Sequence, residues 1–195
     1  MATSATPMGA EPVGTLSASG SFTGKVRHIK IANAYGTAIF YGDFVKLVAT
    51  GTVEKAAVTT AVVAGTVGIF VGCAYTDPNT NQKTFNQQYP ASTAADDIVA
   101  YVVDDPKLLF QMQGDDSIAQ TGLGNNVSAI STAGSTSIGR SKNALDASSI
   151  ATTNTLPLRI VDFVDGPKSS VGDAFTDCIV TYLPLSHAYE TKLGV

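Results

Sequence analysis

The sequence contains few charged side chains. Asp, Glu, Lys and Arg account for 14% of its 195 residues, whereas about a quarter is usual for a soluble domain. Apolar residues account for 44%, and an unfolded chain that is so apolar and so weakly charged would collapse or aggregate. The chain is therefore not disordered as a whole, and we expect a surface made largely of Ser, Thr, Asn, Gln and Gly.

Positive charge is scarce as well. The chain has 12 Lys and Arg residues against 16 Asp and Glu residues, a net charge of −4, which gives no overall electrostatic attraction to nucleic acid. No stretch approaches the roughly 20 apolar residues of a membrane span, and the first residues do not resemble a secretory signal. We therefore expect no direct nucleic-acid partner, no membrane association and synthesis in the cytoplasm.

Cysteine and histidine are nearly absent. The two cysteines are Cys73 and Cys178, and the two histidines are His28 and His187. Each cysteine lies in an apolar run, which favours buried free thiols. A disulfide between the two is kept as an alternative, because a sequence gives no distances between side chains. No CxxC pair occurs, and with so few soft ligands we expect no metal and no cofactor.

Motifs of common catalytic sites are missing too. The chain has no GxSxG elbow, no GxGxxG turn and no P-loop, and a Ser-His-Asp triad needs a histidine held between an acid and a nucleophile. His28 falls in the first expected strand and His187 in the tail, so we expect a protein that is not an enzyme. A small hydrolase that uses His187 is kept as an alternative. Three acidic doublets fall where turns or a helix start are expected, which favours capping roles: Asp96-Asp97, Asp104-Asp105 and Asp115-Asp116.

Glycine, proline and β-branched residues are plentiful instead. The sequence has 18 Gly and 8 Pro between runs rich in Val, Ile and Thr, a pattern typical of β-structure. Thr50-Gly51 and Asp104-Asp105-Pro106 each predict the turn of a hairpin. The expected strands lie in eight segments: 26–33, 44–50, 52–58, 64–77, 98–105, 107–114, 156–165 and 174–185.

The segments between these strands carry weaker signals. Residues 77–97 read as a long polar loop that includes Phe85 and Tyr89, and residues 115–124 as one short helix with an Asp cap. Strict alternation over the strand expected at 64–77 places one set of residues on one face and a second set on the opposite face. The glycines of the second set imply close backbone packing there. The first set is Val67, Ile69, Val71 and Cys73, and the second is Gly68, Phe70, Gly72 and Ala74.

The fold class follows from these elements. With hardly any helix to connect parallel strands, the chain is expected to be all-β, an antiparallel barrel or sandwich. Residues 1–25 have no helix or strand period and read as an extended N-terminal arm, and residues 26–195 as a single domain.

Several stretches together resemble the head decoration (cement) proteins of tailed bacteriophages. The resemblance covers roughly residues 26–185 and is carried by HIKIANAYGTAIFYGDFVKL, GTVGIFVGCAYTDPNTNQKTFNQQYP, DDIVAYVVDDPKLLFQMQ and LPLRIVDFVDGP, preceded by the Ala/Ser/Thr/Pro-rich arm. It implies a β-barrel or β-tulip body and a structural virion protein on the outer capsid surface, made in the host cytoplasm. Such a protein binds major capsid protein subunits as a homotrimer at three-fold and quasi-three-fold positions and contacts neighbouring cement subunits.

This hypothesis assigns partner-binding roles to three groups of residues. The apolar residues of the arm would anchor it on a neighbour, and the basic residues after it would face an acidic capsid surface. A phage tail or fibre carbohydrate-binding module is the alternative, and it would use the aromatic residues of the 77–97 loop. The anchors are Met8, Val13, Leu16 and Phe22, the basic residues are Lys25, Arg27 and Lys30, and the loop aromatics are Phe85 and Tyr89.

Overall fold

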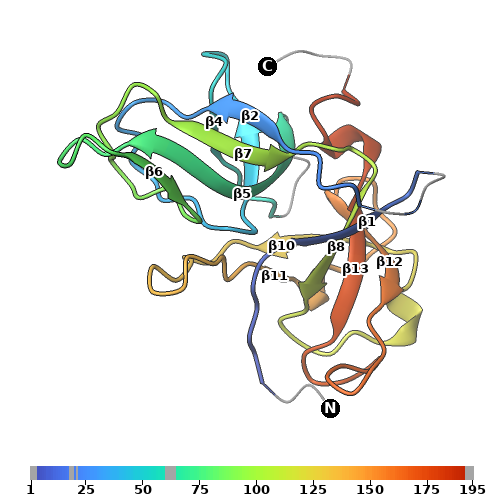
Figure 1. Ribbon diagram of the computed structural model, residues 1–195. Helices are drawn as coiled ribbons and strands as arrows, with labels where there is room; N and C mark the ends of the chain where they lie inside the picture. The colour runs from blue at the N-terminus through green and yellow to red at the C-terminus, as the bar shows by residue number, and fades with distance from the viewer. Residues whose placement is uncertain (1–3, 18–19, 21, 60–64, 192–195) are drawn as a thin grey trace.

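A computed structural model describes residues 4–17, 20, 22–59 and 65–191 (Figure 1). It confirms a nearly all-β chain with antiparallel sheets. Residues 1–3, 18–19 and 21 of the expected arm lie outside the described residues. In Figure 1 the strands gather into two lobes, one holding β2 and β4–β7 and the other holding β1, β8, β12 and β13.

The first lobe is a six-stranded sheet in the order β2-β7-β5-β3-β4, with β6 paired to one end of β5. The hairpin predicted around Thr50-Gly51 is confirmed, because β3 and β4 pair antiparallel and Gly51 has a φ of +76°. The strands are β2 (Arg27–Lys30), β3 (Phe44–Leu47), β4 (Val53–Lys55), β5 (Thr66–Thr76), β6 (Lys83–Asn86) and β7 (Val99–Val103).

The second lobe is a five-stranded sheet in the order β1-β8-β13-β12-β9, accompanied by the two-stranded pair β10-β11. Its strands are β1 (Glu11–Thr15), β8 (Leu108–Gln113), β9 (Asn126–Val127), β10 (Ala129–Ile130), β11 (Ala144–Leu145), β12 (Leu158–Phe163) and β13 (Asp177–Tyr182). Three single 3-10 turns complete the elements: η1 (Gln120–Gly122), η2 (Ala147–Ser149) and η3 (Pro184–Ser186).

The expected barrel does not close. Each sheet ends in edge strands, β2 and β4 in one and β1 and β9 in the other. The edges of the first sheet approach each other at a single bridge between Ile31 and Val53. The body is therefore a pair of open, packed sheets.

The hairpin expected across Asp104-Asp105-Pro106 is wrong. β7 pairs with β2 and β5, whereas β8 pairs with β1 and β13, so the turn carries the chain from one sheet to the other. Asp105 supports this turn, because its carboxylate accepts from the backbone N–H of Lys107 (2.8 Å) and its carbonyl from that of Leu108 (3.1 Å).

The strict alternation expected along β5 is also wrong. The register with β7 shifts between Phe70 and Gly72, and the register with β3 shifts beside Gly68. A bulge reverses which face the following side chains occupy. Ile69 and Val71 consequently pack into the core of the second lobe, whereas Phe70 and Cys73 pack into that of the first. Close backbone packing at the glycines is confirmed at Gly68, where a Cβ atom would lie 2.1 Å from the carbonyl oxygen of Val103.

Two other local predictions need correction. The expected loop at 77–97 contains strand β6, which extends the sheet from β5. The helix expected at 115–124 shrinks to the single turn η1, and its N-cap residue Ala119 makes no side-chain cap. The Asp115 carboxylate instead accepts from the backbone N–H of Ala147 (2.9 Å), so it ties two loops together.

Phe44 joins strand β3 of the first sheet to the core of the second lobe, where it lies with two aromatic rings of the second sheet. Phe44 of β3 packs edge-on against Phe110 of β8 (5.6 Å between ring centroids) and against Tyr182 of β13 (6.1 Å). The cysteines occupy different cores and are free, as the apolar runs favoured, and burial raises the pKa of both thiols to about 12.

Much of the expected arm is docked on the body. β1 forms the edge of the second sheet, with Glu11 opposite Gln111, and Ala10 is fully buried and donates its N–H to the carbonyl of Gly42 (2.9 Å). Gly9 has a φ of +77°, and a Cβ atom there would lie 2.6 Å from both the carbonyl oxygen of Gly42 and the Cβ of Ser141. An extended chain with apolar residues gains burial and hydrogen bonds here, so it forms an edge strand.

We predict that Gly9→Ala lowers the free energy of unfolding by about 3 kcal/mol or more, because it adds overpacking to backbone strain. Gly51→Ala is the matched control, since Gly51 has nearly the same φ (+76°) but open space around it, and it should cost about 1 kcal/mol. Urea denaturation followed by far-UV circular dichroism measures both values. Equal effects of the two substitutions would contradict the tight docking of residues 8–10.

Candidate functional site

The candidate interaction surface is the N-terminal strip, which we define as Met8, Val13 and Leu16. These side chains are 47%, 44% and 50% exposed although all three are large and apolar. Within the described residues β1 pairs with β8 alone, so its second edge has no strand partner. The fourth expected anchor, Phe22, is half-buried and packs against the core of the second lobe.

Beside Met8 the surface is hollowed. A depression of about 560 Å³ lies between residues 4–11 and the outer side of the second sheet. The backbone N–H of Thr6 donates to the side-chain oxygen of Gln113 (2.8 Å), which holds the start of the chain over this sheet. Residues 4–6 are otherwise exposed, so they are the described part of the expected arm that extends furthest from the core.

The basic residues expected at the interface lie around β2, an edge strand. Lys25 and Lys30 are exposed. Arg27 instead forms an ion pair with the buried carboxylate of Asp104 and lies over the ring of Tyr189, 5.5 Å from its centroid. Charged side chains also protect an edge strand from unwanted pairing, which is a structural role for this cluster.

One depression brings three of the expected residues together. Phe22, Lys25 and Arg27 line a hollow of about 380 Å³ whose opposite side carries Asp104 and Asp105. Because both signs of charge are present, the hollow has no strong preference for a charged ligand.

The two aromatic residues of the 77–97 segment have different environments. Phe85 on β6 is 72% exposed and available to a partner. Tyr89 is fully buried, its hydroxyl donates to the carbonyl of Tyr35 (2.9 Å), and burial raises its pKa. The expectation that Tyr89 contacts a partner is therefore wrong, because the residue belongs to the core of the first lobe.

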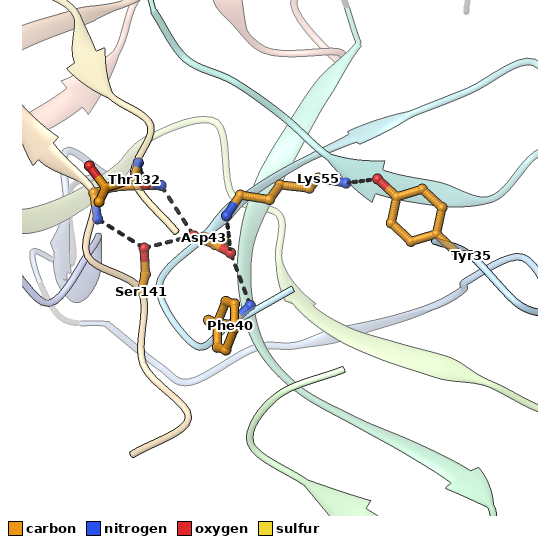
Figure 2. Close-up of polar contacts among 7 residues, drawn as sticks. Tyr35, Phe40, Asp43, Lys55, Thr132 and Ser141 are labelled. Atoms are coloured by element: carbon orange, nitrogen blue, oxygen red, sulfur yellow. Dashed lines mark hydrogen bonds and ion pairs between the residues drawn. The ribbon is translucent and has the colours of Figure 1, made fainter. Parts of the chain in front are cut away.

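Sequence reasoning missed a buried polar cluster around Asp43, shown in Figure 2. The Asp43 side chain is fully buried and forms an ion pair with Lys55 of β4 (2.9 Å). Its carboxylate also accepts hydrogen bonds from the backbone N–H of Phe40 (2.9 Å), the Ser141 hydroxyl (2.7 Å) and the Asn143 amide (3.2 Å). The short YGDF stretch, with one acidic residue inside an apolar run, was the available signal.

This cluster joins three parts of the chain. Asp43 and Lys55 belong to the first lobe, Ser141 and Asn143 lie on the segment before β11, and Gly9 packs against Ser141. A serine, an acid and a lysine in contact can serve hydrolysis when substrate reaches the serine. Ser141 is 1% exposed, and the Asp43 carboxylate already has four donors. The cluster therefore stabilises the fold.

His187, on which the hydrolase alternative depends, has no solvent-exposed surface among the described residues. Its imidazole packs against Tyr182 and Tyr189, at ring-centroid distances of 5.2 and 5.1 Å, and its Nδ1 accepts from the backbone N–H of Tyr189 (3.3 Å).

In the part of the chain that the structure describes, no group of three or more His, Cys, Asp or Glu residues is placed to hold a metal ion. No helix in that part is both long and apolar enough to cross a membrane. Comparison with family models, with curated proteins and with solved structures finds no match for this chain.

We predict that Asp43→Ala lowers the free energy of unfolding by about 3–5 kcal/mol, because it leaves the largely buried Lys55 ammonium without its anion. Asp43→Ala combined with Lys55→Met should cost less than Asp43→Ala alone. Urea denaturation measures the effects, and Lys83→Met is the control, since it removes the cation of the exposed Lys83–Asp97 pair. A shift for Asp43→Ala no larger than that of the control would overturn the structural role of the cluster.

Proposed function

We propose that this chain is a structural virion protein that decorates the outside of an icosahedral capsid of a tailed bacteriophage. It binds the major capsid protein as a homotrimer at three-fold and quasi-three-fold positions and stabilises the shell. The observation that carries the proposal is the N-terminal strip, a set of exposed apolar side chains along a sheet edge in a charge-poor β protein.

The edge of β1 suits binding to another protein surface. Its unpaired backbone groups can accept a neighbouring strand, and Val13 and Leu16 add apolar contacts beside it. A surface rich in hydroxyl and amide groups is cheaper to desolvate than one rich in ions. The chain can therefore form an extensive contact without burying many charges.

The docking of β1 changes how the arm would act. Residues 8–15 remain on the body, so a neighbouring subunit meets an ordered edge. Residues 4–6 extend beyond it, and Lys25 and Lys30 supply charge that steers encounter with an acidic surface.

A carbohydrate-binding module is a second candidate, and the exposure of Phe85 favours it. Thr84 and Asn86 flank Phe85 along β6, and the exposed Lys83–Asp97 ion pair lies at the start of the same strand. An exposed aromatic ring on a strand with amide and hydroxyl groups suits contact with a sugar.

We predict saturable co-sedimentation of the purified protein with empty expanded phage heads, in multiples of three copies per site. Val13→Asp combined with Leu16→Asp should weaken binding at least tenfold, because it places two charges in an apolar contact. Leu123→Asp is the control, since Leu123 is similarly exposed (43%) but lies on another loop. The proposal would be contradicted if the wild-type chain did not bind, or if the double variant bound as tightly as the Leu123→Asp control.

If the second candidate holds, the wild-type protein binds a defined glycan on an array and Phe85→Ala abolishes this binding through loss of the stacking surface. Ile138→Ala, which alters another exposed apolar side chain (59%), should leave it unchanged. Failure of the wild-type protein to bind any glycan excludes this candidate.

A further inference from the structure

The C-terminal segment 183–191 crosses the seam between the two lobes. Its start is tied to the loop before β12, where the backbone N–H of Leu183 donates to the carbonyl of Pro157 (3.0 Å). Further along, the N–H of Ala188 donates to the carbonyl of Thr66 at the start of β5 (2.7 Å). The segment therefore fastens the second sheet to the first.

The end of the segment is held by polar contacts at the turn that links the sheets. The Tyr189 hydroxyl donates to the Asp104 carboxylate (3.0 Å), which also pairs with Arg27. Glu190 lies 3.5 Å from the ammonium of Lys107. These contacts depend on the position of the residues just before them.

His187 sits in the middle of this segment with its ring fully buried. The rings of Tyr182 on β13 and Tyr189 both pack edge-on against the imidazole. Among the described residues, the hydroxyls of Tyr182 and Ser186 have no hydrogen-bond partner, and the Nε2 atom of His187 has none with good geometry, although the Val67 carbonyl lies close enough to favour a proton on the ring. The Nδ1 atom accepts a hydrogen bond from the backbone N–H of Tyr189 (3.3 Å), so this contact is made by the uncharged ring, and a proton on Nδ1 would remove it.

We propose that His187 makes the 183–191 segment an acid-sensitive clasp, closed while the imidazole is neutral and released from the lobe seam when it takes up a proton. A buried imidazolium must find new partners or reach water. Release of the segment exposes the ring of Tyr182 and the ion pair of Arg27 with Asp104.

Burial is the main effect on the His187 imidazole, and it lowers the pKa of the ring below its ordinary 6.5. Stability from the neutral ring is present above pH 6.5, the unfolded value, and declines as the pH falls below it. Several groups around the ring act in the opposite sense by favouring the charged form: the Val67 carbonyl at the start of β5, Asp104 and Asp105 on the β7–β8 turn, and Glu190 on the segment itself. Two further ionisable neighbours, Tyr182 of β13 and Tyr189 of the segment, pack against the ring. The cations of this region are Arg27 of β2, which pairs with Asp104, and Lys107 of the turn, which pairs with Glu190.

Hydrogen exchange with mass spectrometry tests the clasp on the full chain. After correction for the intrinsic rate, protection of residues 183–191 should fall at least tenfold between pH 7.5 and pH 5.0, while that of β12 stays constant. His187→Phe keeps a buried ring that cannot titrate, and it should remove the pH dependence. His28→Gln is the matched control, because it replaces the other histidine, which is exposed on β2, and it should respond like the wild type.

A variant that fails to fold does not end the test. Nuclear magnetic resonance of the wild-type chain distinguishes the two imidazoles, and loss of protection in 183–191 should track the titration of His187. Glu190→Gln separates the histidine from its nearest acid on the segment, and it should retain the pH response. Constant protection of 183–191 across this range, or loss of the response in His28→Gln, overturns the proposal.

Discussion

A carboxylate without access to water constrains the arrangement of the whole molecule. Asp43 can be buried because Lys55 neutralises it and three further donors fill its remaining acceptor sites, and a buried charge without these partners would be costly. The donors come from the first lobe and from the segment before β11, so neither part reaches its final position without the other. The packing of Gly9 against Gly42 and Ser141 adds the N-terminal segment to the same junction.

Around this junction the apolar contacts merge the two sheets into one body. β5 contributes side chains to both cores, and its register shifts place Ile69 in one core and Cys73 in the other, although strict alternation would put both on one face. Phe44 crosses from β3 to meet Phe110 and Tyr182 of the second sheet. The ring contacts of Phe44 and the polar contacts at Asp43 and Asp104 together hold the two lobes of Figure 1 against each other.

The sequence predicts those features of the fold that depend on residues close to one another along the chain. The β class, the β3–β4 hairpin and the strands at Leu158–Phe163 and Asp177–Tyr182 follow from β-branched runs and turn chemistry. Which strands pair depends on contacts distant in sequence, so the turn residues Asp104-Asp105-Pro106 predict a hairpin where the chain passes from one sheet to the other. Tyr89 looked available because it stands among amides, and its burial arises from packing against Tyr35. Of the candidate site, Met8, Val13, Leu16 and Phe85 are exposed, and their binding to a partner stays a prediction. The docking of β1 could not be predicted, because it depends on β8, which is distant in the sequence.

The pairing of β1 with β8 also bears on how the chain is made. Glu11 lies opposite Gln111, so β1 leaves the ribosome well before the strand with which it pairs. Closing so long a loop is slow, and strand pairing across such a separation gives a high contact order. Until β8 is available, the apolar residues near the N-terminus are open to strands of other nascent copies. Neighbouring chains in a crowded cell thus compete with the chain's own β8 for the same edge, and exchange of β1 between copies is the natural misassembly of this fold.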